Sequence, residues 1–195
     1  NDNPYATSTT ERLLADAAQA SVAEGQPPTY SNFGFALLGT ALVRASGVAD
    51  YPTLVAQRLT GPLGMKRTVI AASDADIPAN AVRGHAQNGL VAPRWTGSGY
   101  LPAGSSTFTT AGDLSIWAQA LLTGRGPGSA ALEPTAEMDA GSRIGWAWLS
   151  TRGPEGRVTT WHNGGTAGFR TMLALDRDAG RRCDPVKAHP LRIED

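Results

Sequence analysis

The hydrophobic period of this chain changes once, near residue 141, and that change restricts the possible folds more than any other feature. Before it, apolar residues recur at helical spacing over about 10–24, 32–46, 50–59 and 111–123. After it, apolar and polar residues alternate, which is typical of strands with one buried face. Helices followed by a run of antiparallel strands predict an α+β fold.

The alternating region predicts three strands. Ile144, Trp146 and Trp148 share one face of the first, and residues 158–161 and 171–175 form the other two. The Gly-Pro-Glu-Gly run at 153–156 predicts a hairpin turn between the first two strands. We therefore divide the chain into a mainly helical part with long loops (1–140), a part made of antiparallel strands (141–176) and an atypical tail (177–195).

Polar residues indicate where the helices begin. Ser8 and Glu11 form a capping box, which predicts a helix starting just after Ser8. Asn32 fits the N-cap of the next helix, so Tyr30 is expected at the corner between an extended loop and that helix. Residues 64–106 are rich in Gly, Pro, Ser and Asn and predict a long excursion of loops with one or two short strands.

Two short motifs carry a resemblance to a known family. Tyr30-Ser31-Asn32, with its flanking helix, resembles the Y-x-N region of class C β-lactamases, D-alanyl-D-alanine carboxypeptidases and related esterases. The run 161–169, Trp-His-Asn-Gly-Gly-Thr-Ala-Gly-Phe, resembles the strand that bears their K-T-G or H-x-G motif. The likeness extends over about 1–180 with the motifs in the family's order. It implies a penicillin-binding transpeptidase-like fold, with a helical domain and part of an antiparallel sheet. It also implies acyl-enzyme hydrolysis of a β-lactam, a D-Ala-D-Ala peptide or an ester.

The resemblance assigns a role to each motif residue. Tyr30 would be the general base, although a phenol ionises near pH 10 and needs a nearby cation to act at neutral pH. His162 stands where many relatives have lysine, and an imidazole is mostly uncharged at neutral pH, which favours peptidase or esterase chemistry over β-lactam hydrolysis. Gly165 would supply one backbone N–H of the oxyanion hole. The substrate-binding residues implied are Asn32, Asn163, Gly164, Gly165 and Thr166.

Each of these residues also has a purely structural interpretation. Asn32 can be an ordinary helix N-cap, and the two roles are compatible only if another residue makes the cap. Tyr30 can be a turn tyrosine packed on the next helix, and a lone strand histidine such as His162 is often structural. The glycines can belong to a hairpin turn. The sequence leaves these alternatives open.

The nucleophile of this family, a serine followed three residues later by lysine, does not occur in the sequence. The two lysines, Lys66 and Lys187, follow Leu63 and Asp184 at that spacing. We therefore expect a fragment of a serine hydrolase, inactive by itself and lacking an N-terminal segment; the alternative is a non-catalytic remnant that only binds ligands. The charged tail after Gly180 replaces an expected apolar strand, which predicts a frame change or a cut there.

Composition excludes several other functions. Lys plus Arg and Asp plus Glu both number 17, so no net charge attracts nucleic acid or an anionic membrane. No stretch approaches the roughly 20 apolar residues of a membrane helix. One cysteine and three scattered histidines fit neither a disulfide framework nor zinc spacing. We expect a small-molecule or peptide substrate, no nucleic-acid partner, no metal and no cofactor. The resemblance to the family implies a periplasmic or secreted protein.

Overall fold

The structure, a computed structural model, describes residues 3–86, 88–153 and 155–177. The tail predicted to be atypical therefore lies outside the described residues, apart from Arg177. The described chain folds as two compact units. Unit 1 comprises 3–24, 30–110 and 166–169, and unit 2 comprises 25–29, 111–165 and 170–177, with the gaps just given. The boundary predicted at residue 140 was based on the change of hydrophobic period, not on contacts. It stays a prediction.

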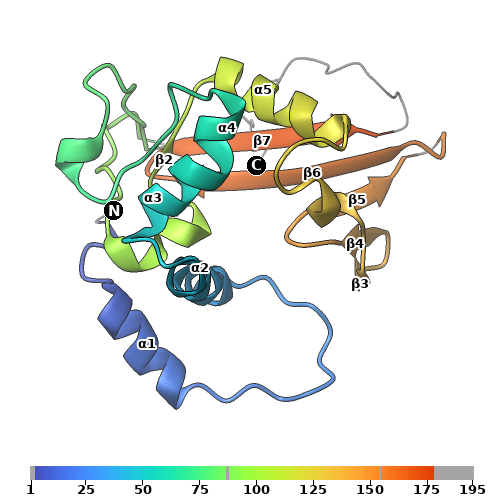
Figure 1. The fold of residues 1–195 in the computed structure, drawn as a ribbon, viewed down its shortest axis with the longest axis horizontal. Coiled ribbons are helices and arrows are strands. Elements are labelled where there is room, and N and C mark those ends of the chain that lie inside the picture. The colour runs from blue at the N-terminus through green and yellow to red at the C-terminus, as the bar shows by residue number, and fades with distance from the viewer. Residues whose placement is uncertain (1–2, 87, 154, 178–195) are drawn as a thin grey trace. The chain divides into compact units, whose positions relative to one another are not determined.

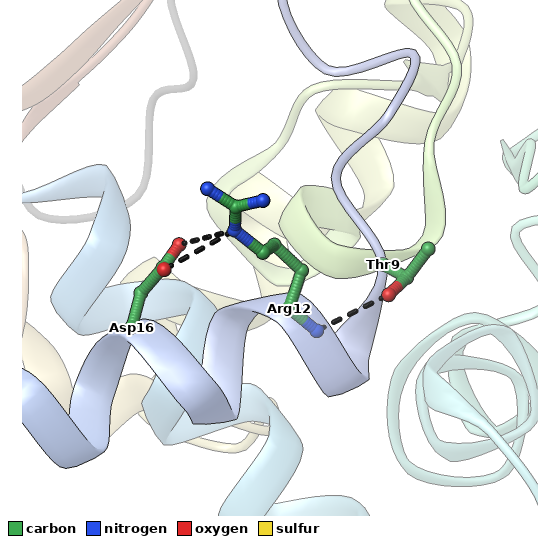
Figure 2. Close-up of polar contacts among 3 residues, drawn as sticks. All are labelled: Thr9, Arg12 and Asp16. Carbon is green, nitrogen blue, oxygen red and sulfur yellow. Dashed lines mark hydrogen bonds and ion pairs between the residues drawn. The ribbon is translucent and has the colours of Figure 1, made fainter.

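Helix α1 spans Thr10–Gln19 in unit 1 and ends five residues earlier than its pattern predicted. Its N-cap is Thr9, whose Oγ1 accepts from the Arg12 N–H at 3.2 Å, so the prediction of Ser8 as the cap was wrong. Figure 2 shows this bond and the ion pair between Arg12 and Asp16 one turn later. The backbone of Ser8 is used elsewhere, because its carbonyl accepts from Gly99 N–H at 2.9 Å.

Helix α2 spans Asn32–Ser46 and ends at Gly47, which adopts the left-handed conformation as a C-terminal glycine often does. The next helix was predicted over about 50–59, but the chain stays helical to Leu63. Its segments are α3 (Tyr51–Val55), the π-helical η1 (Ala56–Thr60) and α4 (Gly61–Leu63). Pro62 does not break this run because it occupies the first turn of α4, where no intrahelical N–H is needed.

The long excursion of unit 1 is loop-rich, as predicted. It contains a small two-stranded sheet of β1 (Val69–Ile70) and β2 (Thr107–Phe108), and the 3₁₀ turns η2 (Asp74–Asp76) and η3 (Ser98–Ala103). Helix α2 packs directly on η3 at Gly39. A Cβ built on Gly39 would lie 2.1 Å from Pro102 Cβ, so only glycine allows this approach.

Unit 2 consists of a helix packed on an antiparallel sheet. The helix α5 spans Ala111–Leu122, and the 3₁₀ turn η4 spans Ser129–Leu132. Five strands follow in the order β3-β4-β5-β6-β7, each beside its sequence neighbour. Figure 1 shows β6 and β7 running side by side as long strands. The strand bounds are Ala136–Asp139, Ser142–Ile144, Leu149–Arg152, Val158–Thr166 and Phe169–Asp176.

The first predicted strand is broken in two. Trp146 is 69% exposed whereas Trp148 is buried, so these side chains do not share a face as the alternation predicted. The cause is a nonlocal contact: Trp146 N–H donates to Ala131 O at 3.0 Å, and a Cβ on Gly145 would lie 2.4 Å from the same oxygen. β5 and β6 pair as the predicted hairpin requires, and the Gly153 N–H donates to Arg157 O at 2.9 Å.

The core of unit 2 includes side chains of β7. Residues from α5, η4, β7 and the position just before β5 meet in one apolar cluster. The hydroxyls of Ser150 on β5 and Thr160 on β6 form a buried cross-strand bond of 3.0 Å. The cluster contains Ala118, Leu121, Leu132, Trp148, Leu173 and Leu175.

No single helix among the described residues is long and apolar enough to cross a membrane. The pair Asn32–Ser46 and Tyr51–Leu63, bent by 73°, passes the same test of length and composition together.

Candidate active site

The Y-x-N motif lies at the start of α2, where the structure resolves the ambiguity over Asn32. The N-cap of α2 is Ser31, whose Oγ accepts from Gly34 N–H at 2.9 Å. Asn32 is the first helical residue, so its amide is not needed to cap the helix. The prediction of Asn32 as N-cap was therefore wrong, because the preceding serine already has extended backbone and a correctly placed hydroxyl.

The Asn32 side chain instead binds Tyr30. Tyr30 lies in the loop before α2, with 64% of its surface exposed, and its phenol donates to Asn32 Oδ1 at 2.7 Å. In this arrangement Tyr30 is the neutral phenol, since the amide oxygen can only accept. A Tyr30 phenolate would lose this bond and would need a donor in its place. The motif thus forms a prearranged pair of a proton donor and an amide at an exposed corner.

Tyr5, in the segment before α1, is a further titratable group of unit 1. Burial raises the pKa of its phenol above the ordinary value, repulsion from Tyr30 adds to this, and an interaction with the Asn32 side chain opposes it. Sequence reasoning missed Tyr5 because nothing in its local pattern distinguishes it.

The second motif runs along β6 in unit 2. His162 Nδ1 lies 2.6 Å from Asn163 O, and a carbonyl can only accept, so Nδ1 carries the proton. In the neutral ring the lone pair then belongs to Nε2. In that tautomer Nε2 is a hydrogen-bond acceptor, the role that binding a hydroxyl requires.

Side chains of the neighbouring strand β7 lie close to two glycines of β6. A Cβ on Gly164 would lie 2.9 Å from Thr171 Oγ1, and one on Gly165 would lie 2.5 Å from Arg170 Nη1. The guanidinium of Arg170 therefore extends over Gly165, the residue proposed for the oxyanion hole. Sequence reasoning missed Arg170, whose side chain the structure places beside Gly165.

The strand that bears His162 is held firmly on both sides. Trp161 Nε1 donates to Thr151 Oγ1 on β5 at 2.9 Å, and Arg157 at the start of β6 pairs with Asp176 at the end of β7. Thr166, the last residue of β6, belongs with the turn 166–169 to unit 1. There a Cβ on Gly168 would lie 2.5 Å from His85 N, so the turn is closely packed.

Titratable groups in the described part of the chain do not gather into a metal centre. No three His, Cys, Asp or Glu side chains there form a group that could hold a metal ion. The two motifs themselves supply a phenol, an imidazole, amides and backbone N–H groups, and Arg170 adds a guanidinium. These are the groups that acyl transfer uses.

Comparison with known proteins gives the family. The sequence model described as Beta-lactamase matches residues 1–182 of the 195. The chain belongs to the Beta-lactamase family. Its α+β fold, with helices and antiparallel sheets, agrees with that of class C β-lactamases, one of which superposes with a TM-score of 0.73. No curated protein matches the sequence.

Solved structures share the fold at low sequence identity. A D-stereospecific amidohydrolase from Streptomyces sp. is 23% identical, with a TM-score of 0.72, and the match covers 88% of this chain and 54% of that one. A D-alanine carboxypeptidase from Burkholderia cenocepacia is 21% identical, with a TM-score of 0.75 and coverages of 91% and 61%. An octameric penicillin-binding protein homologue from Pyrococcus abyssi is 18% identical, with a TM-score of 0.74 and coverages of 92% and 44%. The chain thus spans about half the length of these proteins.

Proposed function

We propose that this chain supplies two of the three parts of an acyl-transfer site in a penicillin-recognising serine hydrolase. The observation that carries the proposal is the bond between Tyr30 Oη and Asn32 Oδ1 at 2.7 Å, together with Ser31 as the helix cap. A turn tyrosine and a capping asparagine would not need this arrangement. Because Ser31 makes the cap, Asn32 remains available to hold Tyr30 and to present its amide to a ligand.

The reaction needs a proton carrier for two steps. A serine hydroxyl attacks the substrate carbonyl while its proton passes to a base, and the C–N or C–O bond then breaks as the leaving group takes up a proton. Water hydrolyses the resulting ester and restores the serine. Tyr30 would carry the proton in this proposal, and His162, with its lone pair on Nε2, would accept from a hydroxyl. The Gly165 N–H would bind the oxyanion.

The substrate class remains a proposal as well. The relatives described above are a D-stereospecific amidohydrolase, a D-alanine carboxypeptidase and a penicillin-binding protein homologue. We propose a small-molecule or peptide substrate with a scissile amide or ester. His162 in place of lysine favours peptide or ester hydrolysis over β-lactam hydrolysis. We also propose a periplasmic or secreted location, as for the family.

The serine and its lysine would have to come from outside these 195 residues, because no Ser-x-x-Lys occurs among them. The chain alone is accordingly expected to remain unlabelled by a fluorescent penicillin. A ligand-binding protein without catalysis would give the same result. The two possibilities differ in what the surrounding gene encodes.

The test starts from the nucleotide sequence on both sides of the reading frame. An in-frame Ser-x-x-Lys upstream supports the proposal, and the longer protein should then form a covalent adduct with fluorescent penicillin. Tyr30→Phe in that protein should slow adduct formation by at least about 100-fold, the usual scale of general acid–base catalysis. Tyr51→Phe, which removes a phenol from α3, is the matched control. Stop codons without such a serine would refute the hydrolase.

A further inference from the structure

The hairpin of β6 and β7 carries one charged side chain that nothing in the hairpin neutralises. Between residues 158 and 175 the sequence has a single arginine, Arg170, and no lysine, aspartate or glutamate. Arg157 and Asp176, which flank that stretch, pair with each other. Arg170 is exposed, and among the described residues its guanidinium takes part in no hydrogen bond or ion pair. Its positive charge is therefore available to a ligand.

The structure places the Arg170 side chain over Gly165. A Cβ built on Gly165 would lie 2.5 Å from Arg170 Nη1, 3.5 Å from Cζ and 3.6 Å from Cδ. Three atoms of the outer half of the side chain are thus close to one point above β6, which means that the side chain lies on the surface of the strand. Any residue larger than glycine at position 165 would displace the guanidinium, so the glycine makes room for it.

Asn163 lies on the same face of β6. Side chains alternate between the two faces of a strand, so positions 163 and 165 share one face and are about 7 Å apart along the strand. The Asn163 amide is exposed and makes no side-chain hydrogen bond within the described part of the chain. The opposite face of β6 carries Thr160, which is buried. An amide and a guanidinium therefore stand together on the open face of the strand.

The chemistry of these two groups fits a carboxylate. A guanidinium presents parallel N–H donors in a fixed fork that matches the two oxygens of a carboxylate. The Asn163 amide adds N–H donors that can bind the same anion or the group attached to it. A side chain that already lies on the strand also loses less conformational freedom on binding than one that extends freely into solvent.

We propose that Arg170, with the amide of Asn163, forms a carboxylate-binding subsite on the open face of β6. The ligand of this chain is then a peptide or small molecule with a free carboxylate, and Arg170 determines that specificity. The assignment of the carboxylate to a hydrolase substrate rests on the proposed function, because Gly165 is the residue proposed for the oxyanion hole. The binding of a carboxylate does not depend on that function.

Binding can be measured by NMR on the ¹⁵N-labelled chain 1–195, without any reaction. The probes are N-acetyl-D-alanyl-D-alanine and its C-terminal amide, which differ only in the carboxylate. The acid should shift the Gly165 N–H and Arg170 Nε–H signals in a saturable way. The amide should bind at least about fivefold more weakly, because hydrogen bonds to a charged group are stronger than those to a neutral one. Equal binding of the two probes, or no shift of either signal with the acid, would overturn the proposal.

Variants of the arginine locate the source of the preference. Arg170→Gln should abolish the preference for the acid, and Arg170→Lys, which keeps the charge without the fork, should retain only part of it. Arg125→Gln removes another exposed arginine of unit 2, in the segment after α5, and is the matched control. It should bind the acid as the native chain does. A preference for the acid that survives Arg170→Gln, or that Arg125→Gln also abolishes, would refute the subsite.

Gly165→Ala tests the position of the guanidinium, because it displaces that group and keeps its charge. It should weaken binding of the acid about as much as Arg170→Gln does, and combining the two changes should add little, since both remove the same contact. A diffuse positive charge would be insensitive to Gly165→Ala, so unchanged affinity in this variant, or additive losses, would contradict the placement over Gly165. The hydrolase proposal stands or fails separately, on adduct formation by the longer protein.

Discussion

Replacing Gly39 by alanine should destabilise the unit that carries Tyr30 and Asn32. The new Cβ would lie 2.1 Å from Pro102 Cβ and 2.4 Å from Pro102 Cγ. Carbon atoms in contact are normally about 3.5–4.0 Å apart, so α2 and η3 would have to separate by more than about 1 Å. The proline ring is rigid and cannot rotate away. Overpacking of this kind costs about 1–3 kcal/mol, and the clash places Gly39→Ala at the upper end.

The same substitution five residues earlier provides a control of opposite sign. A Cβ on Gly34 would lie 3.4 Å from Ser31 Cβ and Oγ, which is close to an ordinary contact. Alanine favours an interior helix position over glycine by about 1 kcal/mol, and by less in the first turn. We expect Gly34→Ala to be neutral or to stabilise by up to about 1 kcal/mol. In Gly39→Ala the same helix preference of alanine offsets part of the cost of the clash. The free energy of unfolding should therefore fall by about 2 kcal/mol.

Urea unfolding followed by far-UV circular dichroism and by tryptophan fluorescence measures both variants, and coincident transitions justify a two-state free energy. Pro102→Gly removes the atoms that clash, so the double variant with Gly39→Ala should recover at least about 1 kcal/mol relative to additivity. A Gly39→Ala chain as stable as the Gly34→Ala chain, or strictly additive effects with Pro102→Gly, would refute the close packing of α2 on η3.

Three further changes test other parts of the structure. Ser31→Ala should cost about 1 kcal/mol and abolish protection of the Gly34 amide in hydrogen exchange, while Ser31→Thr should retain both; full protection in Ser31→Ala would mean another residue caps α2. Hydrogen bonds from Thr53 lower the pKa of the Asp50 carboxyl, so its contribution to stability is present at neutral pH and is lost as pH falls through that lowered value. The stability advantage of the native chain over Asp50→Asn should therefore shrink below about pH 4, and an advantage independent of pH would contradict this. Leu175→Ala should cost about 2–5 kcal/mol, because its side chain lies in the core of unit 2; a loss below about 1 kcal/mol would show that β7 does not pack there.

Local sequence was sufficient wherever one segment determines its own conformation. The helix ending at Gly47, the hairpin at 153–156 and the loop-to-helix corner at Tyr30 all follow from residues within a few positions of each other. A glycine that permits a left-handed backbone, or a turn between alternating runs, acts at short range. The resemblance to the family was confirmed for the same reason, since its motifs are short and keep their order along the chain.

Sequence reasoning failed where distant segments compete for the same groups. The strand through Trp146 breaks because Ala131 O captures its N–H, and Ser8 is not a cap because its carbonyl binds Gly99. The local sequence gives each residue a preference for helix or strand of about 1 kcal/mol or less. The free energy of one long-range hydrogen bond or close contact can exceed that preference.

The candidate site shows the same division. The sequence by itself determined which residues could take part in acyl transfer, because a phenol, an imidazole and glycines at fixed spacing can be recognised without a structure. The structure showed that Ser31 and not its neighbour Asn32 caps α2, and that Asn32 accepts from Tyr30. Only the tertiary structure decided that the turn after the second motif packs against His85. The reason is physical: an amide oxygen and its N–H groups are committed by whichever partner folding brings within about 3 Å, and that partner can lie anywhere in the chain.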